Sequence, residues 1–154
     1  MRKSRVIGSL LGAIVLSSVS VVAGPAAAAA SCHKINAKGV GQDLGEGNTT
    51  ANINGGGLLN GTTRGHFDVG GGTPPVLPIS GTVEFTTNKA TLTVGVNGSF
   101  NVASGDFDAT GPVIASTGKL EGATGNLTLT GTENLATGRF TEKITGTICV
   151  DLAP

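Results

Sequence analysis

Beyond residue 30 the sequence is a series of short runs in which apolar and polar residues alternate, with glycines between the runs. No window of this part shows apolar residues at the 3.6-residue spacing of an amphipathic helix. Alternation places successive side chains on opposite faces of a strand, so the chain is expected to form strands with one apolar face. The short connections leave no room for crossover helices, which parallel strands require. The sheet is therefore predicted to be mostly antiparallel.

About eight strands are predicted. Eight antiparallel strands can close into a barrel, which removes exposed sheet edges, and this is the preferred fold. A two-sheet β-sandwich is the alternative, because the strand count alone fits it nearly as well. The predicted strands are 34–40, 49–54, a strand ending at Val69 after a hairpin turn at 58–63, 82–86, 90–96 and its return strand, 105–110, 126–132 and 138–152.

Three local patterns refine this prediction. Asn97-Gly98 lies between two alternating runs and is predicted to be a hairpin turn, because both central residues of such a turn need positive φ. Residues 70–78 are expected to form a loop or an edge strand, because prolines lack the N–H that a central strand needs. A recurring Thr-Gly pair at six- to eight-residue spacing could indicate a β-solenoid. Because that spacing drifts, we interpret these glycines as the ends of short strands.

Residues 1–30 have the pattern of a signal peptide. Arg2, Lys3 and Arg5 precede an apolar run, and Ala28-Ala29-Ala30 provides small residues for cleavage before Ser31. The mature chain, residues 31–154, is then expected to be a single all-β domain that is secreted to the extracellular space. A membrane anchor is an alternative for the apolar run, which is at the short edge of what spans a bilayer.

The chain has two cysteines, Cys32 and Cys149, one near each end of the predicted mature domain. In an exported protein such a pair indicates a structural disulfide. In a closed barrel the first and last strands are neighbours, so this bond would lie at the seam of the sheet. A lipid on Cys32 is the alternative, and it would leave Cys149 without a partner.

Charge and composition exclude several classes of partner. Without residues 1–30, seven Lys/Arg face ten Asp/Glu, a net charge of −3, which is the wrong sign for a nucleic-acid surface. There is no Trp or Tyr to stack on bases or sugars. No membrane span is expected after removal of the signal peptide. No cofactor is predicted, and two His without a carboxylate at ligand spacing argue against a metal site.

Two glutamates are the candidates for chemistry. Glu142 lies between Phe140 and Ile144 on the predicted core face of the last strand, and Glu133 continues the apolar face of Leu127 and Leu129. Carboxylates directed into a barrel mouth could do acid–base work, because loss of hydration raises their pKa toward neutrality. In the alternative interpretation both lie near strand ends, where solvent or a bulge relaxes the alternation.

Other polar residues give weaker signals. Arg64, His66 and Asp68 share one face of a strand, as a polar cluster or as an ordinary solvated face. Asp106 and Asp108 flank an apolar residue without the ligand ladder of a calcium loop. No serine lies in a nucleophile motif, and the glycine triplets lack the following helix of a phosphate cradle.

One segment resembles a known superfamily. Residues 117–131, Thr-Gly-Lys-Leu-Glu-Gly-Ala-Thr-Gly-Asn-Leu-Thr-Leu-Thr-Gly, are similar to the "GGTG-x-F-x-GATG-x-L" stretch of the allene oxide cyclase/dirigent-like barrels. Ala115-Ser116 and Leu120 depart from that pattern. The end of the chain, Gly-Thr-Ile-Cys-Val-Asp-Leu-Ala-Pro, also resembles small secreted actinobacterial proteins. The resemblance implies an eight-stranded antiparallel barrel, and it transfers no activity and no site residue.

The expected function is that of a non-enzymatic extracellular barrel, which binds a small apolar molecule or has a structural role at the cell envelope. The alternative is an isomerase or cyclase that positions a hydrophobic substrate inside the barrel. An apolar cavity open at one end, with Glu133 or Glu142 buried in it, would favour the enzyme. A barrel filled by its own side chains would exclude both pocket functions. The sequence does not indicate the oligomeric state.

Overall fold

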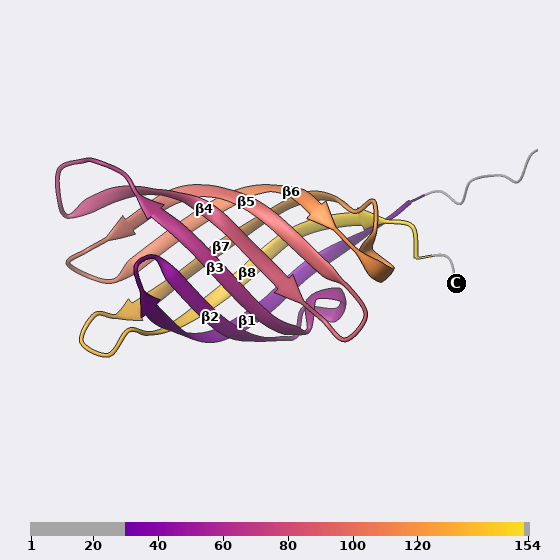
Figure 1. The fold of residues 1–154 in the computed structure, drawn as a ribbon, viewed down its shortest axis with the longest axis horizontal. Coiled ribbons are helices and arrows are strands. Elements are labelled where there is room, and N and C mark those ends of the chain that lie inside the picture. Colours follow the sequence, from indigo (N-terminus) through magenta and orange to yellow (C-terminus); the bar gives the residue numbers. More distant parts are fainter. Residues whose placement is uncertain (1–29, 153–154) are drawn as a thin grey trace, which may run out of the picture.

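The computed structural model describes residues 30–152 as one closed antiparallel barrel, in which each strand pairs with the next and the last pairs with the first (Figure 1). This confirms the predicted barrel and excludes the sandwich and the solenoid. The predicted signal peptide lies outside the described residues, except for residue 30. The strands are β1 (Ser31–Gly45), β2 (Asn48–Asn54), β3 (Gly61–Val69), β4 (Val76–Thr86), β5 (Thr91–Asn101), β6 (Asp106–Ser116), β7 (Thr124–Asn134) and β8 (Arg139–Val150).

The predicted turn at Asn97-Gly98 is wrong. Both residues lie inside β5, where Asn97 pairs with Ser80 of β4 and with Thr110 of β6. Pairing on both sides outweighs the local turn preference of the dipeptide, because the alternation continues through Gly98 to Phe100. The chain turns after Asn101, the last residue of β5, and Gly105 in that turn has a φ of 79°.

Of residues 70–78, predicted to be a loop or an edge strand, 70–75 form the loop, and 76–78 pair in register with β5 alone. Strand β4 begins at Val76, and Pro78 lies within it opposite Ser99 of β5. Although Pro78 cannot donate to the ladder, its carbonyl oxygen accepts a hydrogen bond from the Gly70 N–H at 2.8 Å.

Only three of the six Thr-Gly pairs mark strand ends: 117–118 follows β6, 124–125 begins β7 and 137–138 precedes β8. The pairs at 110–111, 130–131 and 145–146 lie inside β6, β7 and β8. In the first two pairs the threonine is exposed on the outer wall and the glycine faces the interior. A Cβ at Gly111 would overlap the carbonyl oxygen of Gly95, and a Cβ at Gly131 would overlap that of Thr141. These inward glycines therefore allow neighbouring strands to approach closely and bend, as a narrow barrel requires.

The two ends of the barrel are built differently. At one end, here called the closed end, two 3₁₀ turns follow β2 and β6: η1 (Gly57–Leu59) and η2 (Gly118–Leu120). Leu59 and Leu120 on these turns are only 1% and 2% exposed and join the core. The opposite end, here called the open end, carries the connections β1–β2, β3–β4, β5–β6 and β7–β8, which contain no 3₁₀ turn.

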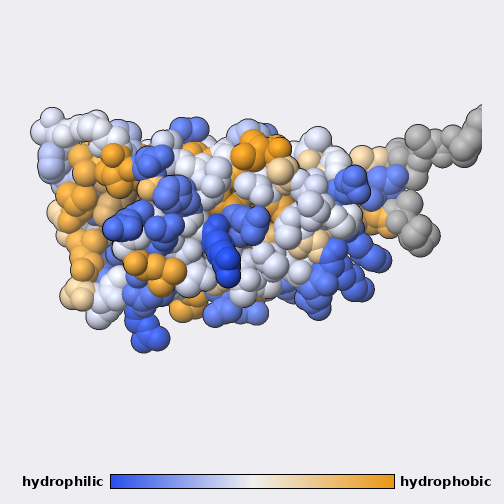
Figure 2. Space-filling model, in the orientation of Figure 1, coloured by the Kyte–Doolittle hydropathy of each residue, from blue (hydrophilic) through white to orange (hydrophobic). Residues whose placement is uncertain are grey.

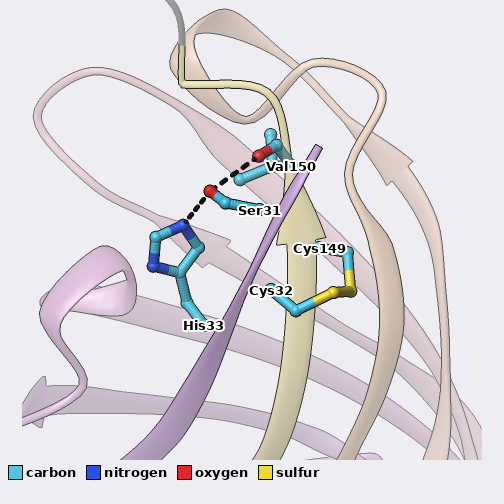
Figure 3. Close-up of a disulfide and its surroundings, with 5 residues drawn as sticks. All are labelled: Ser31, Cys32, His33, Cys149 and Val150. Carbon is cyan, nitrogen blue, oxygen red and sulfur yellow. Dashed lines mark hydrogen bonds between the residues drawn. A yellow bond between two sulfur atoms is a disulfide. The ribbon is translucent and has the colours of Figure 1, made fainter. Parts of the chain in front are cut away.

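The predicted disulfide joins Cys32 of β1 to Cys149 of β8 at the closed end (Figure 3). The two residues are direct partners in the β1–β8 register, which runs unbroken from Ser31–Val150 to Gln42–Arg139. The bond therefore lies at the seam, as predicted. Beside it, the Ser31 hydroxyl lies 2.8 Å from Nε2 of His33 and reaches the Val150 carbonyl oxygen at 3.5 Å (Figure 3).

Candidate functional site: an apolar cup at the open end

Side chains fill the interior from the closed end toward the middle of the barrel, but the interior is hollow near the open end. There a cavity of about 210 Å³ opens to solvent, and we call it the cup. Its walls carry four of the five phenylalanines, Phe67, Phe100, Phe107 and Phe140, together with aliphatic side chains such as Leu129. A dry apolar cavity of about 150 Å³ is enough to hold benzene. The cup therefore has room for a small ring system or a short alkyl chain.

Glycines make room for two of the phenylalanine rings. The Phe107 ring covers Gly131 and the Phe140 ring covers Gly41, so a Cβ at either glycine would overlap the ring. The two rings meet edge to face, with centroids 5.9 Å apart and an interplanar angle of 87°, a favourable arrangement for an aromatic pair. The cup thus has one wall of ordered aromatic side chains rather than an irregular gap.

Two carboxylates, Glu133 and Asp43, line the cup. Glu133 is half-buried at the end of β7, and its pKa is raised, first by loss of hydration and second by the negative charge of Asp43. The sequence singled out Glu133 but missed Asp43, because the first strand was predicted to end at residue 40. The alternation of Ile35, Ala37, Gly39, Gly41 and Asp43 was the available signal.

Glu142, the second predicted residue, is buried inside the barrel and only 8% exposed. It pairs with Gly39 on one side and Gly131 on the other. A Cβ at Gly39 would lie 2.6 Å from Cγ and Oε1 of Glu142 and 2.8 Å from Cδ1 of Ile53, so the carboxyl group occupies the space that glycine leaves. The alternative interpretation, in which solvent relaxes the alternation at a strand end, does not hold for Glu142.

Burial raises the pKa of Glu142 to about 7. Among residues 30–152 the carboxyl group has no hydrogen-bond partner. In the same part of the chain, every fully enclosed side-chain nitrogen or oxygen does have one. The Glu142 oxygens therefore keep contact with space that water can enter. Glu142 is one inward position deeper than Phe140 and does not itself line the cup.

The remaining candidates lie elsewhere. Arg64, His66 and Asp68 are exposed on the outer wall, which agrees with a solvated face, and Nδ1 of His66 hydrogen-bonds Oδ1 of Asn48 at 3.0 Å. Asp106 is also exposed, and its pKa is lowered by hydrogen bonds from Ser104, which has the larger effect, and from Thr132. In the part of the chain that the structure describes, no three His, Cys, Asp or Glu side chains come together to hold a metal ion.

Comparisons with known proteins do not assign this chain to a family or a function. A scan against protein-family models, a search of curated proteins and a search of solved structures each returned no match to this chain. Within residues 30–152, no helix has the length and apolar character needed to cross a membrane. The cup and its carboxylates are therefore the features from which a function can be argued.

Proposed function

We propose that this chain is an exported, non-enzymatic barrel that binds a small apolar molecule in the cup. The observation that carries the proposal is the cavity of about 210 Å³ at the open end, walled by four phenylalanines. Binding sites for small molecules are typically concave and mostly apolar, with a few polar groups that fix orientation. Asp43 and Glu133 are such groups. The filled lower interior gives a ligand a floor.

Export is part of the proposal. The Cys32–Cys149 bond supports it, because disulfides persist in oxidising compartments outside the cytosol. We infer that residues 1–30 are removed as a signal peptide and that the mature chain begins at Ser31. Mass spectrometry of the culture medium tests this inference. The secreted chain should start at Ser31 and weigh about 2 Da less than its reduced form. A lipid-modified Cys32 would contradict it.

A relationship to the allene oxide cyclase/dirigent-like barrels remains a proposal as well. It is supported by the segment 117–131, which forms η2 and most of β7. Gly118 and Gly122 of this segment have φ values of 61° and 74°. Glycine is favoured at such values, so the resemblance includes residues that the backbone requires here.

Ligand binding can be tested with 1-naphthalenemethanol, a neutral fluorescent alcohol whose ring system suits the cup. Because the chain has no Trp or Tyr, the fluorescence of the probe can be read with little protein background. We expect saturable binding to the wild-type protein. The substitution Ala109→Leu fills the cup, because Ala109 lines it, and should weaken binding about tenfold or more.

The matched control is Ala115→Leu, which adds the same side chain to the exposed outer face of β6. It should leave binding unchanged, and thermal unfolding of both variants shows whether each is folded. If Ala109→Leu proves unstable, Phe100→Ala provides a second test, since it removes a ring from the wall of the cup. Absence of saturable binding to the wild type would overturn the proposal in favour of a structural role at the envelope.

One observation favours a second candidate, an isomerase or cyclase. Glu142 is buried in apolar surroundings with its pKa raised to about 7, the value that suits a general acid or base near neutral pH. An apolar ketone such as 2-tetralone, incubated with the protein in D₂O, reports proton transfer at its α-carbon. Exchange catalysed by the wild type and lost in Glu142→Gln, but kept in the exposed control Glu121→Gln, would support the enzyme. No exchange above buffer would exclude proton transfer to such a ketone.

A further inference from the structure

All charges that line the cup have the same sign. Among residues 30–152, Asp43 and Glu133 are the only ionisable side chains in its wall. Arg139 precedes Phe140 on β8, but it is exposed on the outer face of the barrel, as alternation requires. In the part of the chain that the structure describes, a ligand that enters the cup therefore meets an apolar wall and two carboxylates but no basic side chain.

Asp43 is held in place by the surrounding chain. Its Oδ1 accepts a hydrogen bond from the Gly45 N–H at 2.8 Å, and its own N–H donates to the Gly138 carbonyl oxygen at 2.8 Å. The neighbouring Gln42 side-chain amide donates to the Thr137 carbonyl oxygen at 2.8 Å. These bonds join the end of β1 to the turn between β7 and β8. The turn that follows β7 therefore holds Asp43 near the end of the strand that carries Glu133.

The two carboxylates are close enough to repel each other. The negative charge of Asp43 contributes to the raised pKa of Glu133, after the larger effect of burial. Like charges near an apolar surface are costly because little water screens them, and a cation placed between them removes that cost. A hydrated metal ion would lose its water at this aromatic wall without gaining enough oxygen ligands. An ammonium group attached to an apolar body matches both the carboxylates and the wall.

A third carboxyl group lies behind this wall. Glu142 is more than nine-tenths buried, has no hydrogen-bond partner within the described residues, and faces the interior one position below Phe140. With a pKa of about 7 it is only partly ionised near neutral pH, so it adds some negative potential to the same region of the barrel. Lys38 and Lys143, which flank Gly39 and Glu142 along their strands, are exposed on the outer face and line a surface hollow that also reaches Glu142. The preference for a positive charge at the mouth therefore comes from Asp43 and Glu133.

We propose that the ligand of the cup is a small amphiphilic amine, whose apolar body packs against the phenylalanines and whose ammonium group binds between Asp43 and Glu133. This inference rests on the proposed binding function and names the chemical class of its ligand. A primary or secondary amine donates hydrogen bonds to both carboxylates, and such charge-assisted bonds are stronger than those of a neutral alcohol. The cup then selects ligands by their charge at its mouth and by their size in the cavity below the mouth.

The test compares 1-naphthylmethylamine with 1-naphthalenemethanol, which share a ring system and differ in the head group. Fluorescence anisotropy at pH 7.5 and low salt gives both dissociation constants. We expect the amine to bind the wild type about tenfold more tightly than the alcohol, as charge-assisted pairing at a half-buried site implies. In the double variant Asp43→Asn/Glu133→Gln the two affinities should become nearly equal. Asparagine keeps the Oδ1 that accepts from Gly45.

The control variant is Glu121→Gln, which removes one negative charge from an exposed position at the closed end. It should keep the wild-type preference, and this separates the local carboxylates from net charge. Equal affinity of the wild type for both probes would overturn the amine proposal while leaving the binding function intact. Preference for the amine that survives the double variant would also overturn it. Failure of both probes to bind would overturn the binding function itself.

Discussion

The same sheet forms the wall at the closed and open ends of the barrel, but the two ends differ in how the interior is filled. At the closed end, η1 and η2 each place a leucine over the core, and the disulfide joins the strands at the seam. At the open end no apolar side chain of the connections is buried: Leu135 lines the cup but is 48% exposed, and the phenylalanines line a cavity instead of filling it. The loops and the layer of side chains beneath them, rather than the strand count, therefore decide whether an eight-stranded barrel is sealed.

The exposed apolar residues at the open end show the same difference between the two ends. Every connection at the open end carries a large apolar side chain at or near its base, although none of these side chains is buried (Figure 2). Such residues add little to folding, because they remain in water in the folded state. Stability should therefore depend on the closed end and ligand binding on the open end. The residues concerned are Leu44, Val69, Val76, Val102 and Leu135.

The largest effect is expected from removal of the disulfide. The double substitution Cys32→Ala/Cys149→Ala should lower the free energy of unfolding by about 2–5 kcal/mol, because the bond constrains a long loop in the unfolded chain. Urea denaturation measures the loss, and wild-type protein under reducing conditions is the parallel sample. Affinity for 1-naphthalenemethanol should be unchanged at low denaturant. Loss of binding without loss of stability would contradict the division between the two ends.

A pair of leucine substitutions compares the ends directly. Leu59→Ala at the closed end should cost about 3 kcal/mol, because it empties a fully buried site that cannot collapse completely. Leu135→Ala at the open end should cost less than about 0.5 kcal/mol, because Leu135 is 48% exposed. Both values come from urea denaturation. Similar costs for the two substitutions would show that the open end is closed in solution.

The smallest of the three effects is a pH dependence of stability that comes from Glu142. Its pKa is raised from 4.5 to about 7 in the folded protein, so the unfolded state gives up this proton more readily. The folded state is therefore favoured at low pH, and this contribution is lost as the pH rises from about 4.5 to about 7. The loss should amount to roughly 2–3 kcal/mol, allowing for the water contact that the carboxyl group keeps.

Denaturation at pH 5 and pH 8 measures this dependence. Glu142→Gln should remove most of it, whereas Glu121→Gln, on an exposed residue, should keep the wild-type profile. A smaller dependence of the same sign should remain in Glu142→Gln, since the pKa of Glu133 is also raised. If wild-type stability increased from pH 5 to pH 8, the Glu142 carboxyl group would have to be hydrated or paired in solution.

The barrel and its seam could be predicted from sequence, because both depend on simple regularities. Alternation determines which face of each strand is buried, and strand count with short connections favours closure. The position of Cys149 in the last strand then places Cys32 beside it. Local signals were less informative: the Asn97-Gly98 dipeptide prefers a turn, but pairing with two neighbouring strands overrides that preference.

The cup could be predicted only in part. Glu133 and Glu142 were found by continuing the alternation of their strands, but the same pattern does not distinguish a half-buried rim residue from a buried one. Leu59 was interpreted as part of a hairpin turn, and nothing in that pattern shows that its side chain covers the core. A cavity forms where the side chains at one level along the barrel axis do not fill the interior. The position of a residue in the sequence does not by itself define that level.

The placement of both described chain ends at the closed end has a practical consequence (Figure 1). Strand β1 starts and strand β8 finishes beside the disulfide, at the opposite end of the barrel from the cup. A purification tag, a fluorescent fusion or a surface tether added at either terminus would therefore attach far from the mouth of the cup. Protein immobilised in this way would present the cup to the solution, a favourable geometry for surface-based screening of amine libraries.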